Sequence, residues 1–134
     1  MIKVKDKLLL ISFISVIAVA LANFVAIYFY LYWAVWWFDN VSHFLGGLSI
    51  GLFGFWFFHI FFRLPQAKFA SILFITIFMV LVIGGGWEIF EYIYDISDPQ
   101  AGETYWQDTT YDLIADTFGA AVASLIIYKK KLHV

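Results

Sequence analysis

Four long apolar stretches constrain the fold of this chain more than any other feature of its sequence. They run from about Leu8 to Phe38, Val41 to Phe62, Phe69 to Tyr94 and Asp108 to Tyr128. A helix needs about 20 apolar residues to cross a hydrocarbon core about 30 Å thick, so each stretch is long enough. Of the 134 residues, 63% are hydrophobic and only 13% are charged, which leaves no room for a soluble domain. The sequence predicts an all-α integral membrane protein, a single antiparallel bundle of four transmembrane helices.

The first stretch is too long for one untilted crossing, so its aromatic end needs a separate interpretation. We expect a span at about residues 8–30, and the following segment "LYWAVWWF" is typical of an interfacial aromatic belt. The other spans are expected at about 41–62, 69–94 and 108–128, with an outer loop at 96–107. A cleavable signal ending near "ALAN" (20–23) is the alternative for the N-terminus, but the apolar run continues well beyond it, which favours an anchor.

Charge is separated between the two sides of this predicted bundle. In a four-span arrangement the eight basic residues fall on one side, and nine of the ten acidic residues fall on or near the other. The basic residues are Lys3, Lys5, Lys7, Arg63, Lys68, Lys129, Lys130 and Lys131. Because cytoplasmic loops carry an excess of Lys and Arg, both termini are predicted to be cytoplasmic, in a multi-pass protein of a bacterial-type cytoplasmic (inner) membrane.

Acidic residues recur at helical spacing near the outer ends of three spans. The three stripes are Asp39 and His43, then Glu88, Glu91 and Asp95, then Asp108, Asp112 and Asp116. Residues three or four apart lie on one face of a helix, so each span has one polar stripe. Stacked by depth, Asp39, Asp95 and Asp108 form an outer rim. Small residues beside these stripes, such as Gly47 and Gly119, allow close helix packing and a shared cavity.

So many carboxylates need compensating positive charge, because like charges close together disfavour ionisation. No Lys or Arg lies on that side, and the chain has no cysteine that could ligate a metal or act as a nucleophile. One interpretation is a divalent metal ion held by oxygen and imidazole ligands: His43, Glu88, Glu91, Asp112 and Asp116. Protonated, hydrogen-bonded carboxylates and a purely structural polar cap are the alternatives. Asp108 is expected mainly to cap the fourth span.

Three ordered blocks resemble a known family. They are "DNVSHFLGG", "GGWEIFEY" and "WQDTTYDLIADTFGA", and together they cover about Asp39 to Ala123. These blocks resemble those of YjdF-type small bacterial inner-membrane proteins, which are related to the VanZ-like superfamily. The resemblance implies a role at the cell envelope. The VanZ-like pattern tends to have Asn in place of Asp116, and Gln and Arg between the blocks, so the glycopeptide resistance linked to that group is not transferred here.

Three functional interpretations stay open, and whether the protein is an enzyme is left undecided. A bound metal ion could activate water against an envelope lipid or lipid-phosphate at the outer leaflet. Alternatively, the site could bind metal or protons in a transporter, accessory subunit or sensor. In the third interpretation the polar cluster has only a structural role and holds the helices together. We expect membrane lipids as partners and no nucleic acid. The sequence does not predict the metal, the substrate or the oligomeric state.

Overall fold

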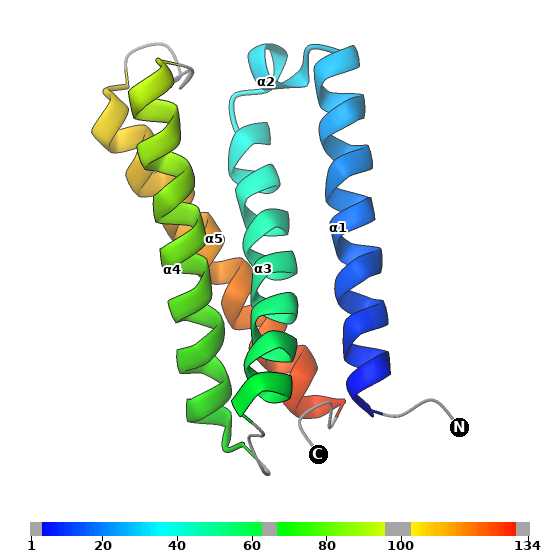
Figure 1. The fold of residues 1–134 in the computed structure, drawn as a ribbon. Coiled ribbons are helices and arrows are strands. Elements are labelled where there is room, and N and C mark those ends of the chain that lie inside the picture. Colours follow the sequence, from blue (N-terminus) through cyan, green and yellow to red (C-terminus); the bar gives the residue numbers. More distant parts are fainter. Residues whose placement is uncertain (1–3, 63–66, 96–102, 131–134) are drawn as a thin grey trace.

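Five helices form the chain in a computed structural model, which describes residues 4–62, 67–95 and 103–130 (Figure 1). They are α1 (Val4–Tyr28), α2 (Leu31–Ala34), α3 (Phe38–Phe62), α4 (Phe69–Tyr94) and α5 (Tyr105–Lys129). The four long helices are each long and apolar enough to cross a membrane, and the described residues contain no strand. The predicted all-α fold with four membrane-spanning helices is confirmed.

Two local features differ from the sequence-based expectation. The aromatic segment after α1 contains a helical turn, α2, which follows Tyr30 in a left-handed conformation with φ of 55°. In addition, α5 begins at Tyr105, inside the expected loop 96–107. Its N-cap is Thr104, whose hydroxyl accepts from the Gln107 amide while the Gln107 side chain accepts from the Thr104 amide. The prediction that Asp108 is the cap is therefore wrong: this reciprocal capping box satisfies the helix end, and Asp108 lies in the first turn.

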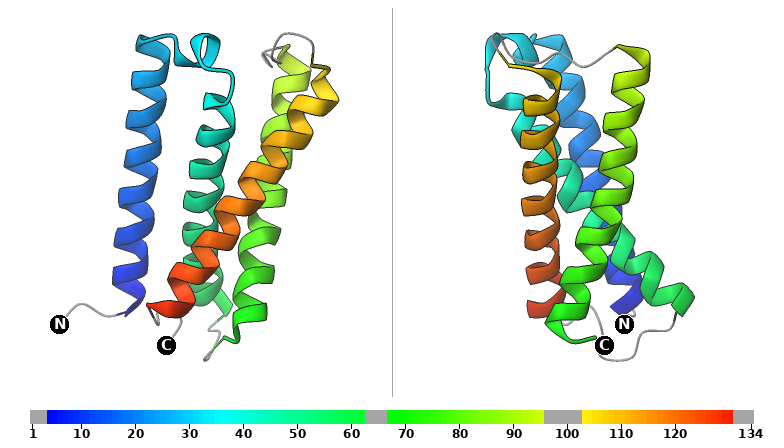
Figure 2. Two further views of the ribbon diagram at one scale, coloured as in Figure 1. Left: turned by 180° about the vertical axis from the view of Figure 1, so that it is seen from behind. Right: turned by 90° about the vertical axis from the view of Figure 1, so that its left-hand side faces the viewer.

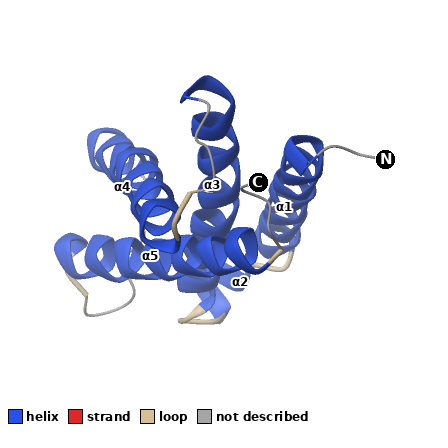
Figure 3. Ribbon diagram, turned by 90° about the horizontal axis from the view of Figure 1, so that it is seen from below, coloured by secondary structure: helices blue, strands red, loops and turns tan. Residues whose placement is uncertain are grey.

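The helix α3 occupies the middle of the bundle and packs against α1, α4 and α5. Figures 1 and 2 show α1, α3 and α4 running along the bundle, whereas α5 crosses obliquely behind α3 and α4. Seen along the bundle in Figure 3, α5 spans one side of the other helices, and α1 stands at the edge next to α3. The most extensive packing in the fold is that of α5 on α3.

One half of the bundle contains an apolar core. Its buried residues come from all four long helices: Leu8, Leu52, Phe55, Ile72, Ile75, Ala123 and Ile127. Within this half, the Thr76 and Ser124 hydroxyls lie 2.6 Å apart. Each hydroxyl can donate its hydrogen either to the other hydroxyl or to a carbonyl of its own helix. These polar groups are satisfied internally, so they do not form a polar path through the core.

The charge separation expected from the sequence is present in the described residues. The start of α1, the start of α4 and the end of α5 lie at the same end of the bundle and carry Lys5, Lys7, Lys68, Lys129 and Lys130 (Figure 1). The stripes of Asp39, Glu88 and Asp112 are near the opposite end. Lys3, Arg63, Asp98, Lys131 and His133 lie outside the described residues. We call the half with the acidic stripes the polar half, and the half around Phe55 the apolar half.

Candidate metal centre

His43 lies at the centre of a cluster of carboxylates drawn from α3 and α5. Its Nε2 atom is 3.8 Å from Oδ1 of Asp39 and 3.7 Å from Oδ1 of Asp112. The ligand atoms of these three residues lie within 4.8 Å of one another. Two atoms bound to one ion at about 2.4 Å can be up to about 4.8 Å apart. The three ligand atoms are therefore close enough together to bind one cation.

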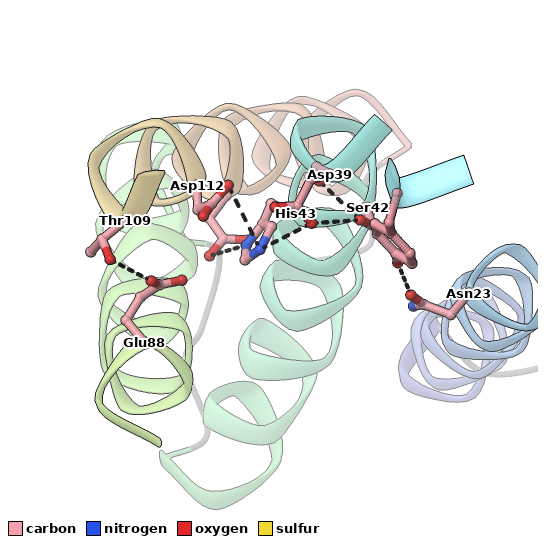
Figure 4. Close-up of polar contacts among 9 residues, drawn as sticks. Asn23, Asp39, Ser42, His43, Glu88, Thr109 and Asp112 are labelled. Atoms are coloured by element: carbon pink, nitrogen blue, oxygen red, sulfur yellow. Dashed lines mark hydrogen bonds and ion pairs between the residues drawn. The ribbon is translucent and has the colours of Figure 1, made fainter. Parts of the chain in front are cut away.

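Asp116 approaches the other side of the same imidazole. Its Oδ2 atom is 3.7 Å from Nδ1 of His43, and the Asp116 side chain is almost completely buried. The two nitrogens of the ring therefore face different carboxylates, as Figure 4 illustrates around His43. Metal-binding histidines generally donate their second N–H to a carboxylate or carbonyl, which fixes the ring and its tautomer. Asp116 stands where such an orienting carboxylate would be.

Glu88 is buried beside this cluster and only half of its carboxylate is satisfied. Its Oε2 atom accepts a 2.8 Å hydrogen bond from the Thr109 hydroxyl, whereas Oε1 has no hydrogen-bond partner among the described residues. In Figure 4 the carboxylate lies between Thr109 and the side on which His43 stands. The residue is only 4% exposed, and a buried oxygen without a partner is costly unless something fills the role. A bound cation or water would satisfy it.

Close contact between α3 and α5 brings these side chains together. A Cβ atom on Gly47 would collide with the backbone of Asp116, and one on Gly119 would collide with the carbonyl of Phe44. Gly84 of α4 is equally important, since its Cβ would lie 2.5 Å from Oδ2 of Asp116. The predicted role of glycines in forming a shared cavity therefore holds at these positions. It does not hold at Gly85 and Gly86, where a Cβ would meet nothing within 4 Å.

A hydrogen-bonded chain links Asp39 to the edge of the bundle. The Ser42 hydroxyl donates to the Asp39 carbonyl at 2.9 Å and lies 3.5 Å from its Oδ1. The Tyr32 hydroxyl of α2 donates to Oδ1 of Asn23 on α1 and is also hydrogen-bonded with the Ser42 side chain. Burial raises the pKa of the Tyr32 phenol, so the hydroxyl keeps its proton at neutral pH. Figure 4 shows Asn23, Ser42 and Asp39 in sequence toward His43.

A cavity of about 670 Å³ opens beside the cluster. Its polar lining includes Asp39, His43, Glu91, Asp108 and Asp116. Its remaining lining comes mostly from apolar, glycine and aromatic residues of α1, α2, α3 and α4: Val19, Ile27, Tyr32, Trp33, Gly46, Ile50, Ile83, Gly84 and Trp87, together with Asn23 and Ser42. The volume is within the range of about 300–1,000 Å³ found for small-molecule sites.

The structure thus distributes the sequence-predicted residues over four places. His43, Asp112 and Asp116 meet at the imidazole, and Asp39, expected on the outer rim, joins them there. Glu88 is buried next to them, while Glu91 and Asp108 line the cavity. Asp95 is exposed at the end of α4, with φ of 51°.

Sequence reasoning missed several residues that support this site. The Thr109 hydroxyl donates to the Glu88 carboxylate, and the Tyr105 hydroxyl donates to the Glu88 carbonyl at 2.7 Å. Asn23 is a polar residue inside an apolar span, which is a signal that could have been used. The sequence places Tyr32 and Trp33 in the interfacial aromatic belt, and nothing in their spacing indicates that they line a cavity.

The comparisons with known proteins agree with the membrane architecture. A family model described as "Predicted membrane protein (DUF2238)" matches residues 3–132, nearly the whole chain. No curated protein and no solved structure matches the chain. Since the match covers all four spans and every residue of the cluster, the chain belongs to the DUF2238 family of predicted membrane proteins.

Proposed function

We propose that this protein binds a divalent cation within the membrane, at Nε2 of His43 and the carboxylates of Asp39 and Asp112. The observation that carries the proposal is the convergence of three ligand atoms from two helices, α3 and α5, within 4.8 Å of one another. Beside them lies a buried carboxylate oxygen of Glu88 that has no partner among the described residues. Oxygen-rich sites with an imidazole are suited to hard or borderline divalent ions. In this assignment Asp116 orients His43, and Glu88, whose buried Oε1 atom has no partner among the described residues, is a further candidate ligand.

Charge balance supports a cation as the occupant. Among the described residues that line the cavity, none is Lys or Arg. The carboxylates of Asp39, Asp112 and Asp116 surround a single imidazole, so even a protonated His43 leaves excess negative charge. A divalent ion would remove that excess of negative charge, which is costly to bury without compensation.

The sidedness of the site is part of the proposal. The Lys residues at one end of the bundle favour a cytoplasmic location for that end, which puts the cluster near the outer face of a bacterial-type inner membrane. The packed apolar half, with its internally paired Thr76 and Ser124, favours a binding site open to one side over a conducting path. The block resemblance to VanZ-like proteins supports a role at the cell envelope.

Metal analysis of the purified protein tests the cation. Protein purified without chelator should contain about one divalent ion per chain, and His43→Ala and Asp112→Asn should each abolish it. His59→Ala and Asp95→Asn are matched controls, because His59 is at the other end of α3 and Asp95 is exposed. Wild-type protein that stays metal-free after incubation with each common divalent ion would refute the proposal.

The role of Asp116 can be separated from that of a ligand. If Asp116 orients the imidazole through Nδ1–H, then Asp116→Asn keeps an acceptor oxygen and should weaken metal binding less than Asp116→Ala, which should cost about 10–100-fold. If both substitutions abolish binding as fully as Asp112→Asn does, Asp116 is a direct ligand. Titration with the ion found in the wild type gives the affinities.

A second candidate function is metal-dependent chemistry on a lipid or lipid-phosphate. The cavity favours it, because it extends from His43 to apolar residues such as Ile50 and Ile83 that could hold an acyl chain. A bound ion would have to attract the phosphate by itself, since the described lining offers no basic side chain. Turnover of lipid-phosphates that is lost with chelator and in His43→Ala would support this candidate. Turnover insensitive to both would remove it.

A further inference from the structure

The cavity beside the cluster is much larger than a metal ion needs, and it has two chemically different ends. Along α3 its lining runs from Asp39 to Ile50, a length of about 16 Å at 1.5 Å per residue. Near the end of the bundle the walls carry Glu91, Asp108 and aromatic rings, whereas Val19, Ile50 and Ile83 make the deeper end apolar. Such a gradient over this length suits an amphiphile lying along the helices.

The walls of this cavity leave a route from the bilayer. α1 and α4 form opposite walls, and both pack against α3 rather than extensively against each other. Most of the membrane-facing surface of α1 is exposed, including Ile27, which is 60% exposed and also lines the cavity. A lipid could therefore enter the cavity laterally from the bilayer, between α1 and α4, without unfolding any helix.

The aromatic and acidic residues of the cavity that lie near the end of the bundle determine which headgroup fits. Trp33, Trp87 and Tyr32 line this end of the cavity together with Glu91 and Asp108, and none of the described lining residues is Lys or Arg. Indole and phenol faces attract ammonium groups by cation–π interaction, and carboxylates add charge complementarity. A headgroup with negative charge alone would be repelled by the carboxylates of Glu91 and Asp108.

We propose that this cavity binds a bilayer lipid whose headgroup carries an ammonium group, with that group among Trp33, Trp87 and Glu91 and an acyl chain along Ile50 and Ile83. The carboxylates of Glu91 and Asp108 belong to this lipid site, whereas Asp39 and Asp112 hold the metal ion. The lipid site does not require the ion, so it goes beyond the cation-binding function and stands independently of it.

Binding of matched amphiphiles to metal-free protein tests the headgroup. In a neutral detergent with EDTA, dodecyltrimethylammonium should bind at least about tenfold more tightly than dodecyl phosphate, measured by calorimetry or by quenching of tryptophan fluorescence. Glu91→Gln and Trp87→Leu should each weaken the ammonium probe by about tenfold. Glu103→Gln and Trp106→Leu are matched controls that should not, because neither residue lines the cavity.

A lipid arm tests the natural source of the ammonium group. In bilayers with equal amounts of phosphatidylethanolamine and phosphatidylglycerol of the same chains, native mass spectrometry should show retention of phosphatidylethanolamine, and Glu91→Gln should lose that preference. Equal retention of both lipids, or equal affinity for the cationic and anionic probes, would overturn the proposal. Tighter binding of dodecyl phosphate that appears only when metal is added would also overturn it, while supporting the metal-dependent lipid-phosphate function.

Discussion

The polar and apolar halves of this bundle are built from the same four long helices but are packed by different means. In the apolar half, Leu52 and Phe55 fill the space between the helices and are at most 1% exposed. In the polar half, Gly47 and Gly119 leave no side chain at the helix contact, and the space beside it is open as a cavity. Close backbone contact can thus hold two helices together without filling the volume around them, which frees that volume for a ligand.

This comparison also explains where the carboxylates can be tolerated. Charged groups in a membrane span are costly and are generally found facing a bundle interior or a cavity. Asp112 and Asp116 are each 3% exposed, and both lie against the polar side of α3 rather than against lipid. The two halves should therefore respond differently to substitution: the apolar half in stability alone, and the polar half in ligand binding as well.

Removing a large core side chain should have the largest effect on stability. Phe55→Ala leaves a cavity at a fully buried position and should lower the free energy of unfolding by about 3 kcal/mol. Metal affinity should stay within about twofold of the wild type, because Phe55 lies three turns from His43 along α3. Denaturant unfolding in detergent and metal titration measure the two quantities. A large loss of affinity at unchanged metal-free structure would contradict the division between the halves.

Adding one methyl group at the helix contact should affect both quantities. Gly119→Ala forces α5 away from Phe44 and Leu48 and should cost about 1–3 kcal/mol of stability. It should also weaken metal binding at least about tenfold, because His43 and Asp112 are on the two helices that separate. Gly86→Ala is the control, since a Cβ there meets nothing within 4 Å and alanine favours helix. Equal behaviour of the two variants would break the proposed role of the contact.

Breaking a hydrogen bond in the apolar half should have a smaller effect. Thr76→Val removes the donor or acceptor that Ser124 meets at 2.6 Å and should cost about 1 kcal/mol, because Ser124 keeps its bond to the Ala120 carbonyl. Metal affinity should be unchanged. A loss of metal binding on this substitution would reveal coupling across the two halves that the internal pairing of these hydroxyls does not provide.

The smallest effect on stability is expected at Glu88, and its sign depends on the metal. Without metal, Glu88→Gln replaces a buried carboxylate that has one unpaired oxygen by a neutral amide, and stability should rise by up to about 1 kcal/mol. With metal, the variant should gain less stabilisation than the wild type, because it offers the ion a weaker ligand. Thermal unfolding with and without the ion checks both signs. The same shift in both conditions would exclude Glu88 from the site.

The sequence was sufficient for the fold because length and hydropathy leave few alternatives for helices in lipid. It was also sufficient to bring His43, Asp112 and Asp116 together, since helical spacing and adjacent glycines act over one or two turns. It failed at two details of local side-chain geometry. The depth assigned to Asp39 ignored that its side chain can turn inward toward His43, 3.8 Å away. The cap assigned to Asp108 overlooked Thr104 and Gln107, which supply a complete capping box one turn earlier.

The part of the cavity lined by α1 and α2 could not have been predicted, because these helices contribute through contacts that no periodic pattern encodes. Tyr32 reaches Asn23 across a turn in which Tyr30 adopts a left-handed conformation. Trp33, expected only as an anchor at the membrane interface, lies against the cavity because of the same turn. Local patterns give each helix its polar face, but they do not say which loop folds over it.

The contact at Gly47 and Gly119 is also the point about which a change in the tilt of α5 would rotate that helix. Asp112 is seven residues from Gly119, so its backbone lies about 10 Å out along α5. His43 is only one turn from Gly47 on α3. A rotation of α5 by about 10° about this point would swing Asp112 through nearly 2 Å while hardly moving His43. In the proposed site, the distances from the ion to its ligands would therefore depend on the crossing angle of α3 and α5, and a force that tilts α5 in the bilayer would change the affinity for the ion.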